Sequence, residues 1–185
     1  MPTFPVALIP SGSWHNFASA RSGQYASAHP ACDIVVPAAT EVLAVARGTI
    51  IAGPYAFAEY TWDDDDHPKC HSITYAIEVK HSEAGFIARY CEIGHRLAQG
   101  LAVGSDVNEA QTIAYVGLQC GPHGPGSGSM LHFEMFKDVN RLDPLTNKTN
   151  DKFLHVKGRG YKRRSDLLDP SSYLDAWMAA DSSTP

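Results

Sequence analysis

The clearest structural signal in the chain is the run Ile73-Thr74-Tyr75-Ala76-Ile77-Glu78-Val79-Lys80, which is followed after a short turn by Gly85-Phe86-Ile87-Ala88-Arg89-Tyr90. Apolar and polar residues alternate along the first run, and alternate residues of an extended chain face the same side. The turn between the two runs, Ser82-Glu83-Ala84, is short enough to join neighbouring antiparallel strands. These residues therefore predict a β-hairpin.

Further short runs rich in β-branched and aromatic residues lie on both sides of this hairpin, at residues 41–46, 48–51, 112–116 and 131–136. Such residues favour strands. Segments rich in turn residues separate them, at 100–106 and 117–129. Because no internal repeat and no clear linker interrupts the pattern, we expect a single, mostly β domain over residues 1–185, with an antiparallel sheet at its core.

One helix is expected, at the C-terminal end. Asp169 is a good N-cap, and Pro170 suits the first helical position. Tyr173, Leu174 and Trp177 would then share one face of the helix.

Two polar segments are expected to be loop insertions, near residues 60–72 and 143–165. The first contains the acidic run Asp63–Asp66 followed by His67. Such a run could bind a cation, but a solvated loop is the better interpretation. The second segment is polar and basic, and we expect it to form a long surface loop before the helix.

The bulk composition limits the classes of function. The chain has 185 residues, 44% of them hydrophobic, and a formal charge of −5. This suits one domain with a proper core and argues against a nucleic-acid binder with a broad basic face. No apolar run approaches the roughly 20 residues of a membrane span. The segment Met1–Pro10 holds three prolines and no basic region, so it does not resemble a secretory signal.

Four cysteines are present, Cys32, Cys70, Cys91 and Cys120, and none forms a C-x-x-C pair. A structural zinc knuckle is therefore not expected. An even number permits two disulfides, with three possible pairings, and four buried thiols are an equally good interpretation. The sequence leaves both alternatives open.

A candidate metal-binding set comes from three separated residues. His29 and Asp33 are four residues apart, so both can face one side of an extended segment, and His132 lies in a predicted strand about a hundred residues later. Two imidazole nitrogens and a carboxylate oxygen are a sufficient protein ligand set for a catalytic zinc, with a fourth position left for water. Taken singly, each of these residues can be explained as an ordinary core or surface residue.

The order of the surrounding motifs resembles that of the lysostaphin-like (LytM-type) zinc metallopeptidases, which cut peptidoglycan. The matching segments are the His29–Asp33 stretch, residues 37–50, Tyr90-Cys91-Glu92, residues 104–117, Met130-Leu131-His132-Phe133-Glu134 and the Asp169-Pro170-Ser171-Ser172-Tyr173-Leu174 ending. The resemblance implies the lysostaphin-like fold, a duplicated hybrid motif with an antiparallel β-sheet core and a substrate groove. It also implies that His29, Asp33 and His132 bind Zn²⁺.

Two residues depart from the family's pattern. Glu92 stands where the family's Y-x-H motif has histidine, and Met130 replaces the first histidine of its H-x-H motif. In the family these histidines handle the water and the charge of the transition state. We expect Glu92 to act as the general base, with His95 or His123 stabilising the oxyanion. The alternative is that Glu92 is a surface residue and the site binds metal without turnover.

Two neighbouring residues have structural alternatives to a role in the site. Glu134 either orients the imidazole of His132 or is a surface carboxylate. His81 is expected to close its strand structurally.

The predicted function is a zinc-dependent peptidoglycan hydrolase, most simply an endopeptidase that cuts stem peptides or cross-links. The alternatives are an amidase that cuts between sugar and peptide, and a non-catalytic wall-binding or regulatory module. Expected partners are peptidoglycan, an immunity or inhibitor protein and a component of a secretion apparatus. We expect synthesis in a bacterial cytoplasm and action in the periplasm or cell wall, as an antibacterial effector of type VI secretion or after phage-type delivery.

Overall fold

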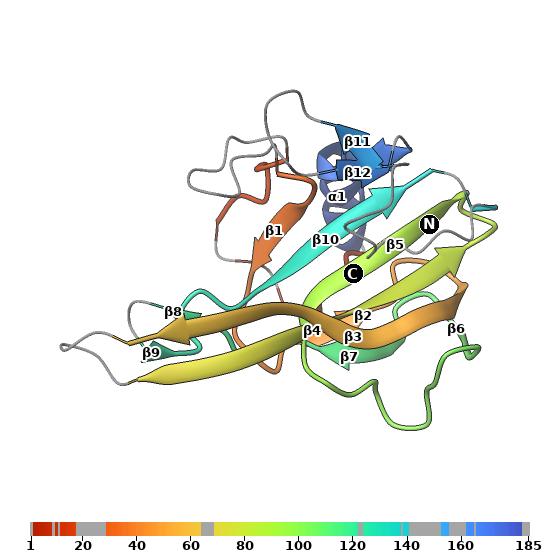
Figure 1. The fold of residues 1–185 in the computed structure, drawn as a ribbon. Coiled ribbons are helices and arrows are strands. Elements are labelled where there is room, and N and C mark those ends of the chain that lie inside the picture. The colour runs from red at the N-terminus through yellow and green to blue at the C-terminus, as the bar shows by residue number, and fades with distance from the viewer. Residues whose placement is uncertain are drawn as a thin grey trace.

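The structure, a computed structural model, describes residues 2–8, 10, 12–17, 29–63, 69–121, 124–137, 139–140, 153–155, 162–164 and 166–182. Within these ranges the chain forms one helix, α1 (Ser171–Asp181), and a series of strands (Figure 1). The strands are β1 (Cys32–Val35), β2 (Glu41–Leu43), β3 (Gly48–Trp62), β4 (Cys70–His81), β5 (Phe86–Ile93), β6 (Asp106–Val107), β7 (Thr112–Tyr115), β8 (Cys120–Gly121), β9 (Gly124–Pro125), β10 (Met130–Phe136), β11 (Phe153–His155), β12 (Lys162–Arg164) and β13 (Leu167–Leu168).

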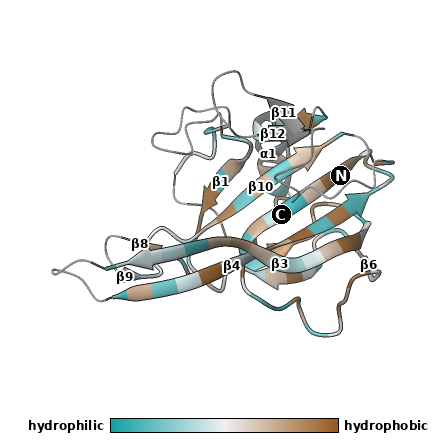
Figure 2. Ribbon diagram, in the orientation of Figure 1, coloured by the Kyte–Doolittle hydropathy of each residue, from teal (hydrophilic) through white to brown (hydrophobic). Residues whose placement is uncertain are grey.

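The predicted hairpin lies at the centre of the main sheet. This sheet has the order β1-β10-β5-β4-β3-β6, with β13 paired to β10, and all its pairings are antiparallel. β4 pairs with β5 from Tyr75 to His81, and the amide of Gly85 donates to the carbonyl of His81 at the turn. Hydrophilic and hydrophobic residues alternate along β4 (Figure 2). The hairpin and the antiparallel, mostly β fold class are therefore confirmed.

The sheet curls so strongly that strands far apart in its order come into contact. Phe57 of β3 lies against His132 of β10, with ring centroids 5.3 Å apart, although β4 and β5 lie between these two strands. The inner residues form one core that includes Ile34, Tyr90 and Phe133. The result is a half-barrel, and its curvature brings the outer strand β3 towards the residues of β1 and β10.

The helix closes one face of this core. Asp169 Oδ1 accepts a hydrogen bond from the amide of Ser171 at 2.8 Å, and Pro170 already has helical dihedral angles. The N-cap is thus Pro170, one residue later than predicted, and Asp169 supplies a hydrogen bond to the first residue of the helix. Leu174 and Trp177 are buried, whereas Tyr173 on the same side is 39% exposed. α1 has 11 residues, and no helix in the described ranges is long and apolar enough to cross a membrane.

The two expected loop insertions are partly strand. β3 runs through Trp62 and β4 begins at Cys70, so both ends of the segment near 60–72 extend the β3–β4 pair, which projects beyond the rest of the sheet (Figure 1). Polar side chains made this segment resemble a loop, but in an outlying pair of strands they face solvent. Within 143–165, β11 pairs with β12. Residues 64–68, which hold most of the acidic run and His67, lie outside the described residues.

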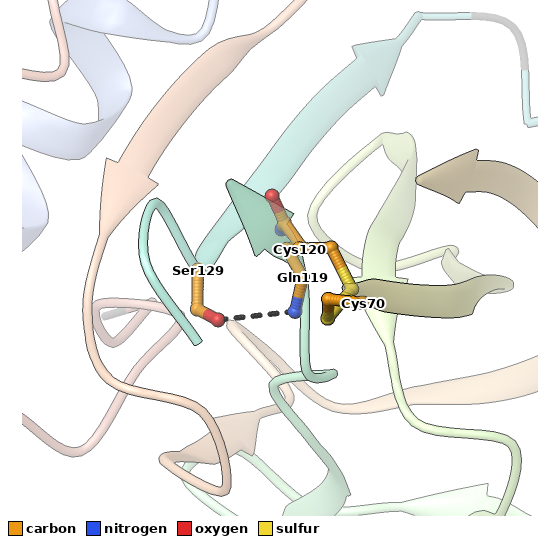
Figure 3. The surroundings of a disulfide bond; sticks show 4 residues. All are labelled: Cys70, Gln119, Cys120 and Ser129. Carbon is orange, nitrogen blue, oxygen red and sulfur yellow. Dashed lines mark hydrogen bonds between the residues drawn. A yellow bond between two sulfur atoms is a disulfide. The ribbon is translucent and has the colours of Figure 1, made fainter. Parts of the chain in front are cut away.

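The cysteines follow neither of the two simple alternatives. Cys70 and Cys120 form a disulfide (Figure 3), whereas Cys32 and Cys91 are buried thiols. Next to the disulfide, the amide of Gln119 donates to Ser129 Oγ at 3.3 Å. The bond therefore ties the start of β4 to the start of β8.

Removing this disulfide is expected to lower the free energy of unfolding. It closes a loop with a sequence separation of 50 residues, and the entropy of such a loop corresponds to about 4 kcal/mol. Unfolding of the Cys70→Ser/Cys120→Ser double variant in denaturant measures the loss. A reductant should destabilise the wild type towards the variant and leave the variant unchanged, and equal unfolding midpoints for the two proteins would contradict the expectation.

His81 is expected to make the fold sensitive to acid. It is fully buried, its Nδ1 lies 3.2 Å from the carbonyl of Arg47, and its Nε2 lies 3.3 Å from the hydroxyl of Tyr90. Burial lowers the pKa of His81 from 6.5 to about 4. The unfolded chain therefore binds the extra proton first, and the stability that His81 contributes above pH 6.5 is lost as the pH falls towards 4.

This loss amounts to about 3 kcal/mol at most. The His81→Gln variant cannot titrate, so its unfolding free energy should fall less steeply than that of the wild type across the same pH window. Denaturant unfolding of both proteins at several pH values measures the difference. Parallel pH dependences would show that His81 does not cause the sensitivity.

Candidate metal site

The three predicted ligand residues meet at the junction of two neighbouring strands. Asp33 of β1 lies directly opposite His132 of β10 in their antiparallel register. His29 precedes β1 and is itself buried. The apolar residues that follow Asp33, including Ile34, anchor β1 in the core and so hold both His29 and Asp33 in place.

The ligand atoms of these residues converge on one point. His29 Nε2 lies 3.3 Å from His132 Nδ1 and 3.2 Å from Asp33 Oδ1, and His132 Nδ1 lies 2.9 Å from Asp33 Oδ1. Bonds of 2.0–2.1 Å in a tetrahedral zinc site place ligand atoms about 3.3 Å apart. Two nitrogens and one carboxylate oxygen at these separations fit a zinc ion with one position left open.

The hydrogen-bond partners of the two histidine rings fix which nitrogen of each ring faces the point where the ligand atoms converge. His29 Nδ1 lies 3.1 Å from the carbonyl oxygen of Asn16, and His132 Nε2 lies 3.0 Å from Glu134 Oε1. Each of these nitrogens is assigned as the one that carries hydrogen, because a carbonyl or carboxylate oxygen can only accept. The opposite nitrogen of each ring is then free to bind a metal.

Asn16 also holds the carboxylate ligand. Its Nδ2 donates to Asp33 Oδ2 at 3.0 Å, and its Oδ1 accepts from the amide of Asp33 at 2.8 Å. Asn16 was not among the residues predicted from the sequence. Its role depends on its backbone carbonyl as well as its side-chain amide, and on a loop that folds beside β1, which residue type and spacing do not reveal.

Glu134 is buried, which agrees with a role in orienting the imidazole of His132 and contradicts the alternative of a surface carboxylate. Its second oxygen accepts a hydrogen bond from Arg89 Nη1 at 3.2 Å. Arg89 Nε donates to the hydroxyl of Tyr55 at 2.9 Å, and that hydroxyl donates to Glu78. A buried arginine thus balances the carboxylate that orients His132.

The electrostatics of the site favour a positive charge. Burial opposes ionisation of Asp33, yet hydrogen bonds from His132 and His29 hold its pKa well below the usual range. Burial also opposes the imidazolium of His132, but Asp33 and Glu134 raise the pKa of this residue to about 9. Two carboxylates around one imidazole therefore create a negative environment that suits a cation.

Glu92 lies beside this site at an irregularity of β5. The register between β4 and β5 shifts at this point, and Glu92 has a positive φ of 65°. Such a bulge turns a side chain away from the face that strict alternation would give it. Gly117 donates its amide to the carbonyl of Glu92, and a side chain at Gly117 would meet the backbone of Ile93 and Glu92 within 3.0 Å.

The carboxylate of Glu92 is buried and held from two sides. Tyr60 donates a hydrogen bond to its Oε1, and Gln119 Nε2 donates to its Oε2 at 2.7 Å. Burial raises the pKa of Glu92, whereas the positive charge of His132 lowers it and the negative charge of Asp33 raises it. The surface alternative for Glu92 is therefore wrong, and its role as the base stays a prediction.

The structure ties the remaining predicted residues less directly to the metal ligands. Met130 is half-buried, and its backbone carbonyl accepts a hydrogen bond from Gln119 Nε2 at 3.2 Å. His95 is exposed after β5, with its ring 6.2 Å from that of Tyr75. His123 lies outside the described residues. The roles of His95 and His123 in oxyanion stabilisation stay predictions.

A curled antiparallel sheet thus holds two histidines and an aspartate whose ligand atoms converge, which defines a candidate metal site. The chain belongs to peptidase family M23, whose family model matches residues 27–144. It is therefore a member of a zinc metallopeptidase family, with a candidate His/Asp/His metal site. No curated protein sequence matches the chain.

Solved structures agree with this fold. The catalytic domain of the antimicrobial peptidase lysostaphin from Staphylococcus simulans is 16% identical, with a TM-score of 0.52, over 87% of this chain and 90% of that domain. The structure of cbpa from L. salivarius REN is 15% identical, with a TM-score of 0.50, over 97% of both chains. At these identities the likeness concerns the fold alone, and it confirms the lysostaphin-like architecture.

Proposed function

We propose that the protein is a zinc-dependent peptidoglycan endopeptidase that cleaves stem peptides or cross-links. The observation that carries this proposal is the convergence of His29 Nε2, Asp33 Oδ1 and His132 Nδ1 on one point, beside the buried carboxylate of Glu92. Membership of family M23 supports peptidoglycan as the substrate.

In this proposal His29, Asp33 and His132 hold the zinc ion. A zinc ion at this point would polarise the scissile carbonyl group and make a water molecule more acidic. Asn16 and Glu134 keep the ligand atoms of the two imidazoles and the carboxylate aimed at the ion.

Glu92 would act as the general base. Its carboxylate accepts a proton from the attacking water and later delivers it to the nitrogen of the leaving amine. Burial raises the pKa of this carboxyl, which brings its basicity closer to that needed at neutral pH. Tyr60 and Gln119 hold the carboxylate in one orientation.

Digestion of purified sacculi tests the function and identifies the bond. The zinc-loaded protein is incubated with sacculi, and the soluble muropeptides are separated and identified by mass spectrometry. New amino and carboxyl termini within the peptides would support the endopeptidase. Release of intact stem peptides from the sugar would identify an amidase instead, and binding to sacculi without any product would indicate a wall-binding or regulatory module.

We further propose that the enzyme is made in the bacterial cytoplasm and acts in the periplasm or cell wall. The Cys70–Cys120 disulfide supports this location, because such bonds persist in oxidising compartments. Delivery as an antibacterial effector, by type VI secretion or by a phage lysis system, belongs to the same proposal. An immunity protein would then protect the producing cell, and co-expression of a neighbouring gene that relieves toxicity would test this.

A further inference from the structure

The outlying strand β3 brings to the site a residue that the sequence analysis did not single out. We call residues 55–62 of β3 and 70–76 of β4 the arm. Tyr60 lies in the arm, and its hydroxyl donates a hydrogen bond to Glu92 Oε1. Phe57, earlier in the same strand, lies against the ligand residue His132. The arm therefore passes beside the metal ligands and holds the Tyr60 hydroxyl at the site.

Tyr60 is on the inner side of the arm. Ala58, Tyr60 and Trp62 are half-buried, while Glu59 and Thr61 between them are exposed. This alternation shows that the ring of Tyr60 points inward, although one side of it still reaches solvent. A hydroxyl in this position can meet both Glu92 and a substrate that enters the site from solution.

Peptide hydrolysis needs a hydrogen-bond donor for the carbonyl oxygen as that oxygen becomes negative. The side chain of Met130 has no hydrogen atom to donate. The side-chain amide of Gln119 is already engaged by Glu92 and by the carbonyl of Met130. A tyrosine hydroxyl is protonated at neutral pH and can rotate from one acceptor to another. Tyr60 is thus one donor that the described residues offer at this place.

Strand pairing and a disulfide hold the arm in place near Tyr60. Tyr60 pairs with Ser72 across the arm, and Trp62 pairs with Cys70. Cys70 is bonded to Cys120, which follows Gln119 in the chain. One disulfide therefore holds together the two segments that supply both hydrogen-bond donors to Glu92.

We infer that Tyr60 is a catalytic residue, an inference that rests on the proposed function. Its hydroxyl turns from Glu92 to the carbonyl oxygen of the scissile bond in the transition state. As the water oxygen bonds to the carbonyl carbon, Glu92 accepts a proton from that water, and the π electrons of the carbonyl move onto its oxygen. The C–N bond then breaks, and the proton passes from Glu92 to the leaving nitrogen. Tyr60 keeps its own proton throughout.

Kinetics of the Tyr60→Phe variant test this role, with Tyr115→Phe as the control for an exposed tyrosine in β7. The substrate is a soluble muropeptide that the wild type cleaves, and the probe is a phosphinate analogue of the cleaved bond. For Tyr60→Phe we expect kcat to fall about 100-fold and KM to change by less than about twofold. Affinity for the phosphinate should fall by a factor similar to that of kcat.

Zinc content and thermal stability of Tyr60→Phe should match the wild type, because the ring that packs in the arm is retained. An unchanged kcat would overturn the inference while leaving the proposed function in place. A lower kcat with unchanged phosphinate affinity would also overturn it, because the hydroxyl would then act only through Glu92. An inactive wild type would overturn the proposed function and this inference with it.

Discussion

Replacing Asp33 by asparagine is expected to weaken zinc binding at least about 100-fold and to lower turnover with it. The variant keeps the shape of the side chain but removes the only negative charge among the three ligand atoms. It also places an amide where Asp33 accepts hydrogen bonds from Asn16 and the ligand histidines. Because partners behind a ligand already contribute 10–100-fold to metal affinity, loss of the ligand itself should cost at least about 100-fold.

Competition with a chromogenic chelator measures zinc affinity of the Asp33→Asn variant, and release of muropeptides measures its activity. Asp106→Asn is a matched control, since Asp106 is an exposed aspartate of β6. It should bind zinc as the wild type does. Stoichiometric zinc in Asp33→Asn at wild-type affinity would mean that the ion binds elsewhere in the chain.

Replacing Glu92 by glutamine is expected to slow catalysis strongly while the metal site stays intact. Glu92 is not one of the three converging ligand residues, and a glutamine of the same shape can still accept a hydrogen bond from Tyr60. An amide cannot accept the proton of the attacking water, and general bases contribute typically 10²–10⁴-fold to the rate. We therefore expect kcat to fall within that range at unchanged zinc stoichiometry.

The control for this variant is Glu59→Gln, which neutralises an exposed glutamate in β3. Its kcat should equal that of the wild type. Turnover of Glu92→Gln at the wild-type rate would remove Glu92 from the mechanism. Loss of zinc in Glu92→Gln would instead mean that this carboxylate supports the metal site and is not a separate base.

The central part of the fold was predictable because its signal is local. The alternation in β4 and the short turn before β5 both lie within one hairpin, and Asp169 and Pro170 start the helix next to them in sequence. The arm was not predictable in the same way. Its outer residues are polar because they face solvent, and a polar segment with an acidic run resembles a loop until its pairing partner is known.

The residues of the site also fall into two groups, those that could be predicted from the sequence and those that could not. His29, Asp33 and His132 could be predicted because ligand chemistry depends on residue type, which the sequence displays. Asn16 and Tyr60 could not, because one acts partly through its backbone carbonyl and the other reaches the site only through the curvature of the sheet. The positive φ that directs Glu92 is likewise a property of the bulge in β5 and not of the residue's type.

Zinc titration of the metal-free wild type tests the central claim most directly. The chelator-treated protein is supplied with increasing zinc, and soluble muropeptides released from sacculi are measured at each step. The site formed by His29, Asp33 and His132 predicts that activity rises linearly to about one zinc per chain and then stays constant. No zinc-dependent product at any pH would contradict the assignment of this protein as a zinc peptidase acting on peptidoglycan.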